Sequence, residues 1–184
     1  RWCLWLENIS PKELRNMPLL MQRVENVKIF RETSIAPSTQ KHALTPTLFR
    51  DRKRPNTFIV VPSTTSENRA YIPMGFFDKN YIANNSCHII PNGDLFLFGQ
   101  LTSLMHMSWV KYTCGRLESR FRYSKDIVYN NYPFPKNVTE KHKELVEKKS
   151  QNVLDIRASF SDCSLADLYD PLSMPPNLKK AHQE

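Results

Sequence analysis

A chain of 184 residues, 40% of them hydrophobic, has room for one packed domain with appended helices, and this composition argues against wholesale disorder. The net charge of +8 favours a polyanionic partner, although many proteins this basic bind no nucleic acid. No apolar run approaches the roughly 20 residues of a membrane-spanning helix and none reads as a signal peptide, so we expect no membrane partner.

The first third of the chain, residues 1–55, is predicted to be a helical connector. Ser10 and Glu13 form a capping box around a proline in the first helical position, which marks a helix start. Pro18 interrupts this pattern, so we expect a second helix over about residues 18–33. Residues 34–56 contain three prolines and many polar side chains, and we expect a long basic connection there. Because the chain starts without methionine, we expect it to be part of a longer protein.

Consecutive short strands joined by tight turns are predicted for the middle of the chain, residues 56–135, and they favour antiparallel pairing. The expected strands are Thr57–Pro62, Ala70–Phe77, Tyr81–Ala83 and Cys87–Ile90. Apolar residues at helical spacing predict one helix from about Gln100 to Cys114, with Gly115 as its C-terminal cap. That helix leads into an extended segment, Arg116–Arg122.

The last part of the chain, residues 136–184, is predicted to be helical. Thr139 is a possible cap for a helix from Glu140 to about Phe160, which is rich in Lys and Glu at helical spacing. Two shorter helices are expected over Ser164–Tyr169 and Asn177–Gln183. The whole chain is therefore predicted to have an α+β fold, with an N-terminal helical connector, a mostly antiparallel β core with one packed helix, and C-terminal helices.

Charged side chains alternate along the extended segment in the middle of the chain. Alternation places Arg116, Glu118, Arg120 and Arg122 on one face of a strand. Such a face can read base edges, because arginine donates two hydrogen bonds to guanine and glutamate accepts one from the amino group of cytosine. A solvated strand with cross-strand ion pairs is the alternative interpretation of the same residues.

The stretch from Gly115 to Pro135 follows the pattern Gly-Arg-Leu-x-Ser-x-aromatic-Arg-Tyr-Ser-x-Asp-Ile-Val-Tyr-Asn-Asn-aromatic-Pro-aromatic-Pro. It resembles the target-recognition domain of the MmeI-like (type IIL) DNA methyltransferases, large bacterial proteins that include restriction–modification enzymes with a fused nuclease and some that act in phage defence. The resemblance extends over nearly the whole chain through the segments Arg1–Leu6, Tyr71–Phe76, Phe98–Ser103, His106–Trp109 and Leu168–Pro176. It implies a module that reads double-stranded DNA in the major groove and positions an adenine for the methyltransferase domain of the same parent chain.

The resemblance also implies that the two variable positions of Gly-Arg-Leu-x-Ser-x contact bases and change together with the base recognised. These positions are Glu118 and Arg120, which could grip one C·G pair from both sides. Asn85 and Ser86, together with Asn84, are candidates for a second base position. An ordinary turn explains these three residues equally well.

Phosphate contacts are expected from cations around these positions, since such contacts fix register without reading sequence. Residues 1–55 carry 11 Lys/Arg against 5 Asp/Glu, and residues 56–135 carry 7 against 5. The expected phosphate-binding residues are Arg50, Arg52, Lys53, Arg54, Arg116, Arg122 and Lys125. The first four could instead belong to a mobile linker, and Arg116 or Arg122 could anchor the strand through an ion pair with Asp126.

No catalytic residue or metal site is predicted in this chain. An adenine methyltransferase needs an Asn/Asp-Pro-Pro-aromatic loop for the flipped base and a glycine-rich turn for S-adenosylmethionine, and the sequence has neither. Its histidines and cysteines share no ligand spacing, and the lack of a C-x-x-C pair favours reduced thiols in a cytoplasm. We therefore expect the cofactor in the parent's catalytic domain. The alternative function is a protein–protein docking or scaffold domain with an incidental basic surface.

Overall fold

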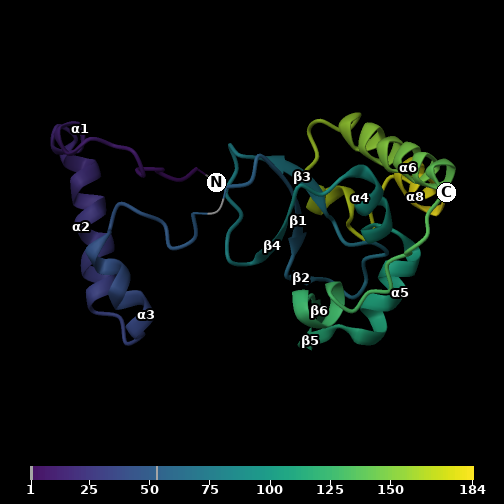
Figure 1. The fold of residues 1–184 in the computed structure, drawn as a ribbon, viewed down its shortest axis with the longest axis horizontal. Helices are drawn as coiled ribbons and strands as arrows, with labels where there is room; N and C mark the ends of the chain where they lie inside the picture. Colours follow the sequence, from purple (N-terminus) through teal and green to yellow (C-terminus); the bar gives the residue numbers. More distant parts are fainter. Residues whose placement is uncertain (1, 53) are drawn as a thin grey trace. The chain divides into compact units, whose positions relative to one another are not determined.

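The computed structural model of the protein describes residues 2–52 and 54–184. The described chain forms two units, residues 2–52 and residues 54–184 (Figure 1). The predicted α+β fold is confirmed, because helices in both units accompany two antiparallel three-stranded sheets in the second. Among the described residues, no helix is long and apolar enough to cross a membrane.

The first unit contains the helices α1 (Pro11–Arg15), α2 (Pro18–Glu32) and α3 (Pro37–Gln40), followed by the short 3-10 helix η1 (Lys41–Leu44). The predicted capping box is confirmed. The Ser10 hydroxyl accepts a hydrogen bond from the Glu13 amide at 3.1 Å, and the Glu13 carboxylate accepts one from the Ser10 amide at 3.1 Å. The predicted second helix is confirmed as α2, which starts with proline at its first position.

The segment after α2, which was predicted to be a long basic connection, contains the helical turns α3 and η1. The Arg31 guanidinium donates hydrogen bonds to the carbonyls of His42, Thr45 and Leu48, each at 2.9 Å, and so folds this segment back along α2. Sequence patterns do not reveal such contacts, because the three acceptors are backbone atoms that every residue carries.

The first sheet has β1 (Thr57–Pro62) in its centre, with β3 (Gly75–Asp78) on one side and β4 (Cys87–Pro91) on the other. Both pairings are antiparallel. β1 and β4 lie where they were predicted, because each is an apolar run bounded by turn residues.

One predicted strand is shorter than expected, and another does not form. The strand expected from Ala70 begins only at Gly75, since Pro73 has no amide hydrogen to donate to a sheet ladder. The strand expected over Tyr81–Ala83 does not form. The chain turns at Lys79 and Asn80, directly before this segment, where the Asp78 carboxylate accepts a hydrogen bond from the Asn80 amide at 2.8 Å.

Two helices, α4 (Leu95–Leu101) and α5 (Leu104–Thr113), replace the single helix predicted from about Gln100 to Cys114. Ser103 separates them, because its hydroxyl accepts a hydrogen bond from the His106 amide at 3.1 Å and caps α5. The prediction of Gly115 as a helix cap is wrong, since its φ is not positive and it begins strand β5.

The second sheet has the order β2 (Thr64–Thr65), β6 (Arg120–Arg122) and β5 (Gly115–Leu117), and both pairings are antiparallel. The prediction of one extended segment over Arg116–Arg122 is therefore wrong. The chain reverses between β5 and β6 in a two-residue hairpin. After β6, a single π-helical turn, η2 (Lys125–Tyr129), packs against α5.

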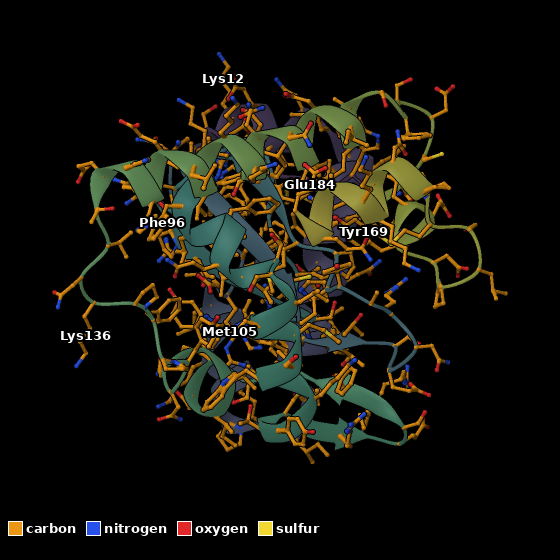
Figure 2. The ribbon with its side chains drawn as sticks, turned by 90° about the vertical axis from the view of Figure 1, so that its right-hand side faces the viewer. Lys12, Phe96, Met105, Lys136, Tyr169 and Glu184 are labelled. Atoms are coloured by element: carbon orange, nitrogen blue, oxygen red, sulfur yellow. The ribbon has the colours of Figure 1, made fainter. Side chains whose placement is uncertain are left out.

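The C-terminal part forms α6 (Glu140–Ala158), α7 (Leu165–Leu168) and α8 (Pro176–Gln183), close to the predicted bounds. α6 packs against α4 and α8, at the end of the second unit away from the β5–β6 hairpin (Figure 1 and Figure 2). Gly99 permits the close approach of α4 and α6, because a Cβ at this position would come within 2.7 Å of Val146 Cγ1.

A buried arginine joins these helices to the rest of the core. Arg157 is 8% exposed, and it donates hydrogen bonds to the Met74 carbonyl and the Tyr169 hydroxyl, both at 2.7 Å. Its guanidinium also lies over the Phe98 ring, 5.2 Å from the centroid. The Tyr169 hydroxyl contacts Nε2 of His182, and burial together with the Arg157 charge lowers the pKa of this histidine to about 4. The C-terminal helices and the segment before β3 therefore share one core.

Candidate nucleic-acid interface

The β5–β6 hairpin ends in a turn that exposes a carboxylate and a guanidinium side by side. Leu117 pairs with Arg120, which leaves Glu118 and Ser119 as the two turn residues. Glu118 has a φ of 57°, in the left-handed region that glycine or asparagine usually occupies in such turns. Arg120 Nη2 donates to Glu118 Oε2 at 2.8 Å, with 47% and 77% of the two side chains exposed. The acceptor and the donor thus meet at the tip of a turn.

The turn changes which side chains share a face, and the predicted single face is wrong. Residues directly opposite each other in an antiparallel pair lie on the same face, and Arg116 is opposite Phe121. The Arg116 guanidinium lies 4.0 Å from the centroid of that ring, and its Nη1 donates to the Ser119 carbonyl at 3.0 Å. Arg120 and Arg122 alternate with Phe121 and share the other face. Arg116 therefore stabilises the turn through its contacts with Phe121 and Ser119.

Two buried aromatic side chains fix the base of the hairpin. Phe121 and Tyr123 are 2% and 3% exposed. The Tyr123 hydroxyl lies 3.0 Å from Nε2 of the buried His106, and the Tyr123 amide donates to the Ser63 carbonyl at 2.8 Å. Burial raises the pKa of Tyr123 and lowers the pKa of His106 to about 4, so both side chains are neutral at pH 7. An exposed tip thus stands on a base held by packing and hydrogen bonds.

A third charged group at the tip, Glu67, was not predicted from the sequence. Glu67 lies in the turn that directly follows β2, the strand that pairs with β6. Hydrogen bonding to its own backbone and to the Ser119 side chain, together with the charges of Arg116 and Arg120, favours the ionised form of its carboxylate. These interactions lower the pKa of Glu67. Its sequence neighbourhood gives no signal, because only the pairing of two strands distant along the chain brings it to the tip.

The candidates for a second base position form a turn next to the base of the hairpin. The Asn84 side-chain oxygen accepts a hydrogen bond from the Ser86 amide at 2.9 Å, which is an Asx turn. Asn85 is exposed. The Ser86 carbonyl accepts from the Ser63 amide at 2.9 Å, and Ser63 in turn accepts from Tyr123. Backbone hydrogen bonds therefore link this turn to the strand that carries Arg120.

Some of the predicted phosphate-binding residues lie near the junction of the two units along the chain. Arg50 is exposed, and Arg52 Nη1 lies 3.5 Å from Glu7 Oε1. Lys53, like Arg1, lies outside the described residues. Arg54 donates hydrogen bonds through two N–H groups to the carbonyl of Lys79.

The other predicted cations flank the hairpin. Arg122 and Lys125 are exposed, and Lys125 Nζ lies 3.5 Å from Asp126 Oδ1. The alternative in which Asp126 pairs with Arg116 or Arg122 is wrong, because within residues 54–184 its carboxylate contacts Lys125 and Asn130 instead. The described part of the chain contains no group of three His, Cys, Asp or Glu side chains that could hold a metal ion.

Comparison with known proteins assigns the chain to a protein family. Residues 1–136 match the family model of the MmeI target recognition domain, and residues 138–184 match that of the MmeI C-terminal domain. The chain belongs to the MmeI family. Over its whole length it is 41% identical to DNA methyltransferase A of Bacillus subtilis (strain 168), of which it covers 21%.

A solved structure shows the same MmeI-family fold. It is that of the type IIL restriction–modification enzyme MmeI in complex with DNA, with a TM-score of 0.93 and 42% sequence identity over 99% of this chain. The match covers 24% of the MmeI chain, so this chain spans between a fifth and a quarter of the length of both relatives. The resemblance inferred from the sequence is confirmed. The hairpin and the Asn84–Ser86 turn both lie in the part that matches the recognition domain.

Proposed function

We propose that this chain reads DNA sequence for a larger, S-adenosylmethionine-dependent bacterial DNA adenine methyltransferase. The two relatives support this role, since one is named as a DNA methyltransferase and the other as a restriction–modification enzyme in complex with DNA. The observation that carries the proposal is the exposed Glu118–Arg120 pair on a hairpin whose base is buried.

The chemistry of this pair suits the recognition of one C·G base pair. The major groove of B-DNA admits a two-stranded β-ribbon, and there cytosine presents an amino donor while guanine presents two acceptors. Glu118 accepts from cytosine and Arg120 donates to guanine. The left-handed conformation of Glu118 costs about 1–2 kcal/mol, and such strain concentrates at functional sites. Asn85 and Ser86 are proposed to read a second base pair.

The surrounding cations are proposed to hold the DNA backbone. Arg122 and Lys125 flank the reading face, and the Arg50–Arg54 segment supplies further charge. Arg116 uses one of its five donors on Ser119, which leaves others for a phosphate. The methyltransferase domain, S-adenosylmethionine and the catalytic residues belong to the rest of the parent protein, which acts in the bacterial cytoplasm with or without a nuclease domain.

A charge swap at the tip tests the base assignment. The double substitution Glu118→Lys with Arg120→Asp is made in the full-length protein, and the methylated word is determined by single-molecule methylome sequencing of the host. The swap keeps opposite charges at the two positions, so the tip can still form an ion pair. We expect the variant to methylate a word in which one C·G pair is inverted to G·C.

The control substitution is Glu144→Gln on α6, at the other end of the second unit from the hairpin, and it should leave the word unchanged (Figure 1). If the double swap methylates the same word as the parent, Glu118 and Arg120 do not read a base pair. Loss of all methylation together with a lowered melting temperature would direct the test to the single substitution Arg120→Ala. That variant should accept several bases at one position, and an unchanged word would refute the assignment.

Docking on another protein is the second candidate function, and one observation favours it for the first unit. Within residues 2–52, Val24 and Ala43 are the buried hydrophobic residues, whereas Leu19 and Phe30 are 77% and 70% exposed. Exposed apolar side chains of this kind can mark a protein interface. The salt dependence of duplex binding separates the two functions, because a DNA reader loses affinity steeply as salt is added and a docking domain need not bind DNA.

A further inference from the structure

The two elements proposed to read bases, the hairpin and the Asn84–Ser86 turn, are joined through a ring of hydrogen bonds. The Ser63 amide donates to the Ser86 carbonyl at 2.9 Å, and the Tyr123 amide donates to the Ser63 carbonyl at 2.8 Å. Nε2 of His88 lies 3.1 Å from the Tyr123 carbonyl oxygen. Because His88 follows Ser86 by two residues in the chain, this third contact closes the ring.

His88 contributes its side chain to this ring, whereas the other two bonds join backbone atoms. It belongs to β4, where it lies opposite Val61 in the first sheet. Tyr123 directly follows β6 in the second sheet, so the contact crosses from one sheet to the other. A carbonyl oxygen can only accept, and Nε2 of His88 therefore carries the hydrogen in this bond. A substitution at His88 can open the ring without changing the backbone.

The ring lies close along the chain to both reading elements. Arg120 precedes Tyr123 by three residues, and Asn85 precedes His88 by three. Tyr123 is 3% exposed, and its hydroxyl lies 3.0 Å from Nε2 of the buried His106. Its ring centroid lies 6.2 Å from that of the His88 imidazole. His88 thus connects the turn to a residue that the core already holds in place.

We propose that His88 is a positioning residue that fixes the hairpin and the Asn84–Ser86 turn in their relative places for base reading. The inference rests on the proposed function of these two elements. Hydrogen bonds to base edges need closely aligned donors and acceptors, and an element that can shift adapts to a wrong base pair at little cost. Closing the ring removes this freedom, so that a wrong base pair leaves a polar group without a partner.

Three substitutions of His88 in the full-length protein test this role. His88→Leu removes the donor, and His88→Asn keeps a donor on a side chain too short to reach the Tyr123 carbonyl. His88→Gln keeps a donor at about the position of Nε2. The measurement is kcat/KM for methylation of three synthetic duplexes, which carry the parent word or a change at the base pair read by the tip or by the turn. Arg120→Ala identifies the first of these pairs, and Asn85→Ala identifies the second.

We expect His88→Leu and His88→Asn to lower the preference for the parent word by about three- to tenfold at both base pairs, the range that one neutral hydrogen bond supplies. His88→Gln should keep the parental preference at both. The matched control is His142→Leu, which replaces an exposed histidine on α6 and should leave both preferences unchanged. Each variant is assayed below its own melting temperature, so that every protein compared is folded.

A merely structural contact would lower kcat/KM for all three duplexes by one factor and leave both preferences as they are in the parent, which would overturn the inference. A loss confined to one of the two base pairs would overturn it as well. So would an equal loss in His88→Gln, because this variant keeps the donor. If His88→Leu does not fold, the comparison of His88→Asn with His88→Gln decides by the same criteria.

The variants of the reading elements separate this inference from the function on which it rests. If the charge swap at Glu118 and Arg120 changes the methylated word and His88→Asn leaves both preferences unchanged, His88 has no positioning role and the base assignment stands. If the swap or Asn85→Ala leaves the word unchanged, the assignment of that element is wrong, and the joint positioning role fails with it. Lowered preferences at both base pairs, kept in His88→Gln, support the positioning role.

Discussion

Two substitutions of Glu118, to alanine and to glycine, should differ in their effect on stability but not in their effect on base discrimination. This residue occupies the left-handed region with a φ of 57°, which costs a residue with a side chain about 1–2 kcal/mol. Glycine avoids this cost, but its greater freedom in the unfolded chain lowers the free energy of unfolding by about 0.5–1 kcal/mol relative to alanine. Glu118→Ala and Glu118→Gly both lose the exposed ion pair with Arg120, so that loss cancels between them. The glycine variant should therefore be more stable than the alanine variant by about 0.5–1 kcal/mol.

Urea unfolding followed by tryptophan fluorescence measures this difference. Trp109 reports on the second unit, because its indole N–H donates to the Val128 carbonyl at 2.9 Å beside the hairpin. The midpoints should differ by roughly 0.3–0.5 M urea. Both variants lack the carboxylate and should lose discrimination at the same base pair to the same extent. A glycine variant no more stable than the alanine variant would refute the reasoning about strain, and retained discrimination would refute the reading role of Glu118.

Three further predictions concern the fold and the surface. Gly99→Ala should destabilise the protein by about 1–2 kcal/mol, because the added Cβ meets Val146 Cγ1 at 2.7 Å. Gly115→Ala is the control, because its Cβ would lie 4.0 Å from the Arg122 carbonyl oxygen. It should change the unfolding free energy by less than about 0.5 kcal/mol. Burial lowers the pKa values of His106 and His182 to about 4 in the folded protein, from an ordinary value of 6.5. The unfolded chain therefore binds protons first as the pH falls, and the free energy of unfolding should decrease between pH 6.5 and 4 by up to about 3 kcal/mol for each histidine. A flat profile of unfolding free energy over this range would contradict their burial as neutral groups. Arg122→Ala should weaken binding to all duplexes alike and reduce the magnitude of the salt slope by about one unit, and fluorescence anisotropy at several salt concentrations would expose an effect limited to one sequence.

The elements that the sequence predicted well carry strong local signals. The capping box at Ser10, the apolar run of β1 and the periodicity of α6 each depend on residues close together in the chain. The hairpin turn was missed because Glu118 and Ser119 are neither glycine, asparagine nor proline, and alternating charges continue across it. Its position is set by the burial of Phe121 and Tyr123, which is a property of the whole core.

The candidate site was predicted only in part, because some of its features depend on contacts between distant parts of the chain. A family pattern singled out Glu118 and Arg120, and the structure brings their side chains together at 2.8 Å. It also moves Arg116 to the other face, where its guanidinium covers an aromatic ring. Glu67 could not be found from local sequence, because it follows β2 and only the pairing of β2 with β6 brings these two parts of the chain together.

The buried Arg157 sets a practical rule for building chimeras with relatives of different specificity. Its hydrogen-bond partners are Met74, from the recognition part of the chain, and Tyr169, from the C-terminal part. A graft joined at residue 137 would keep Arg157 with Tyr169 and replace Met74, so the guanidinium would depend on a foreign backbone to place a carbonyl at the same point. New specificities are therefore better transplanted as residues 54–184 in one piece, or as single side chains at the hairpin tip.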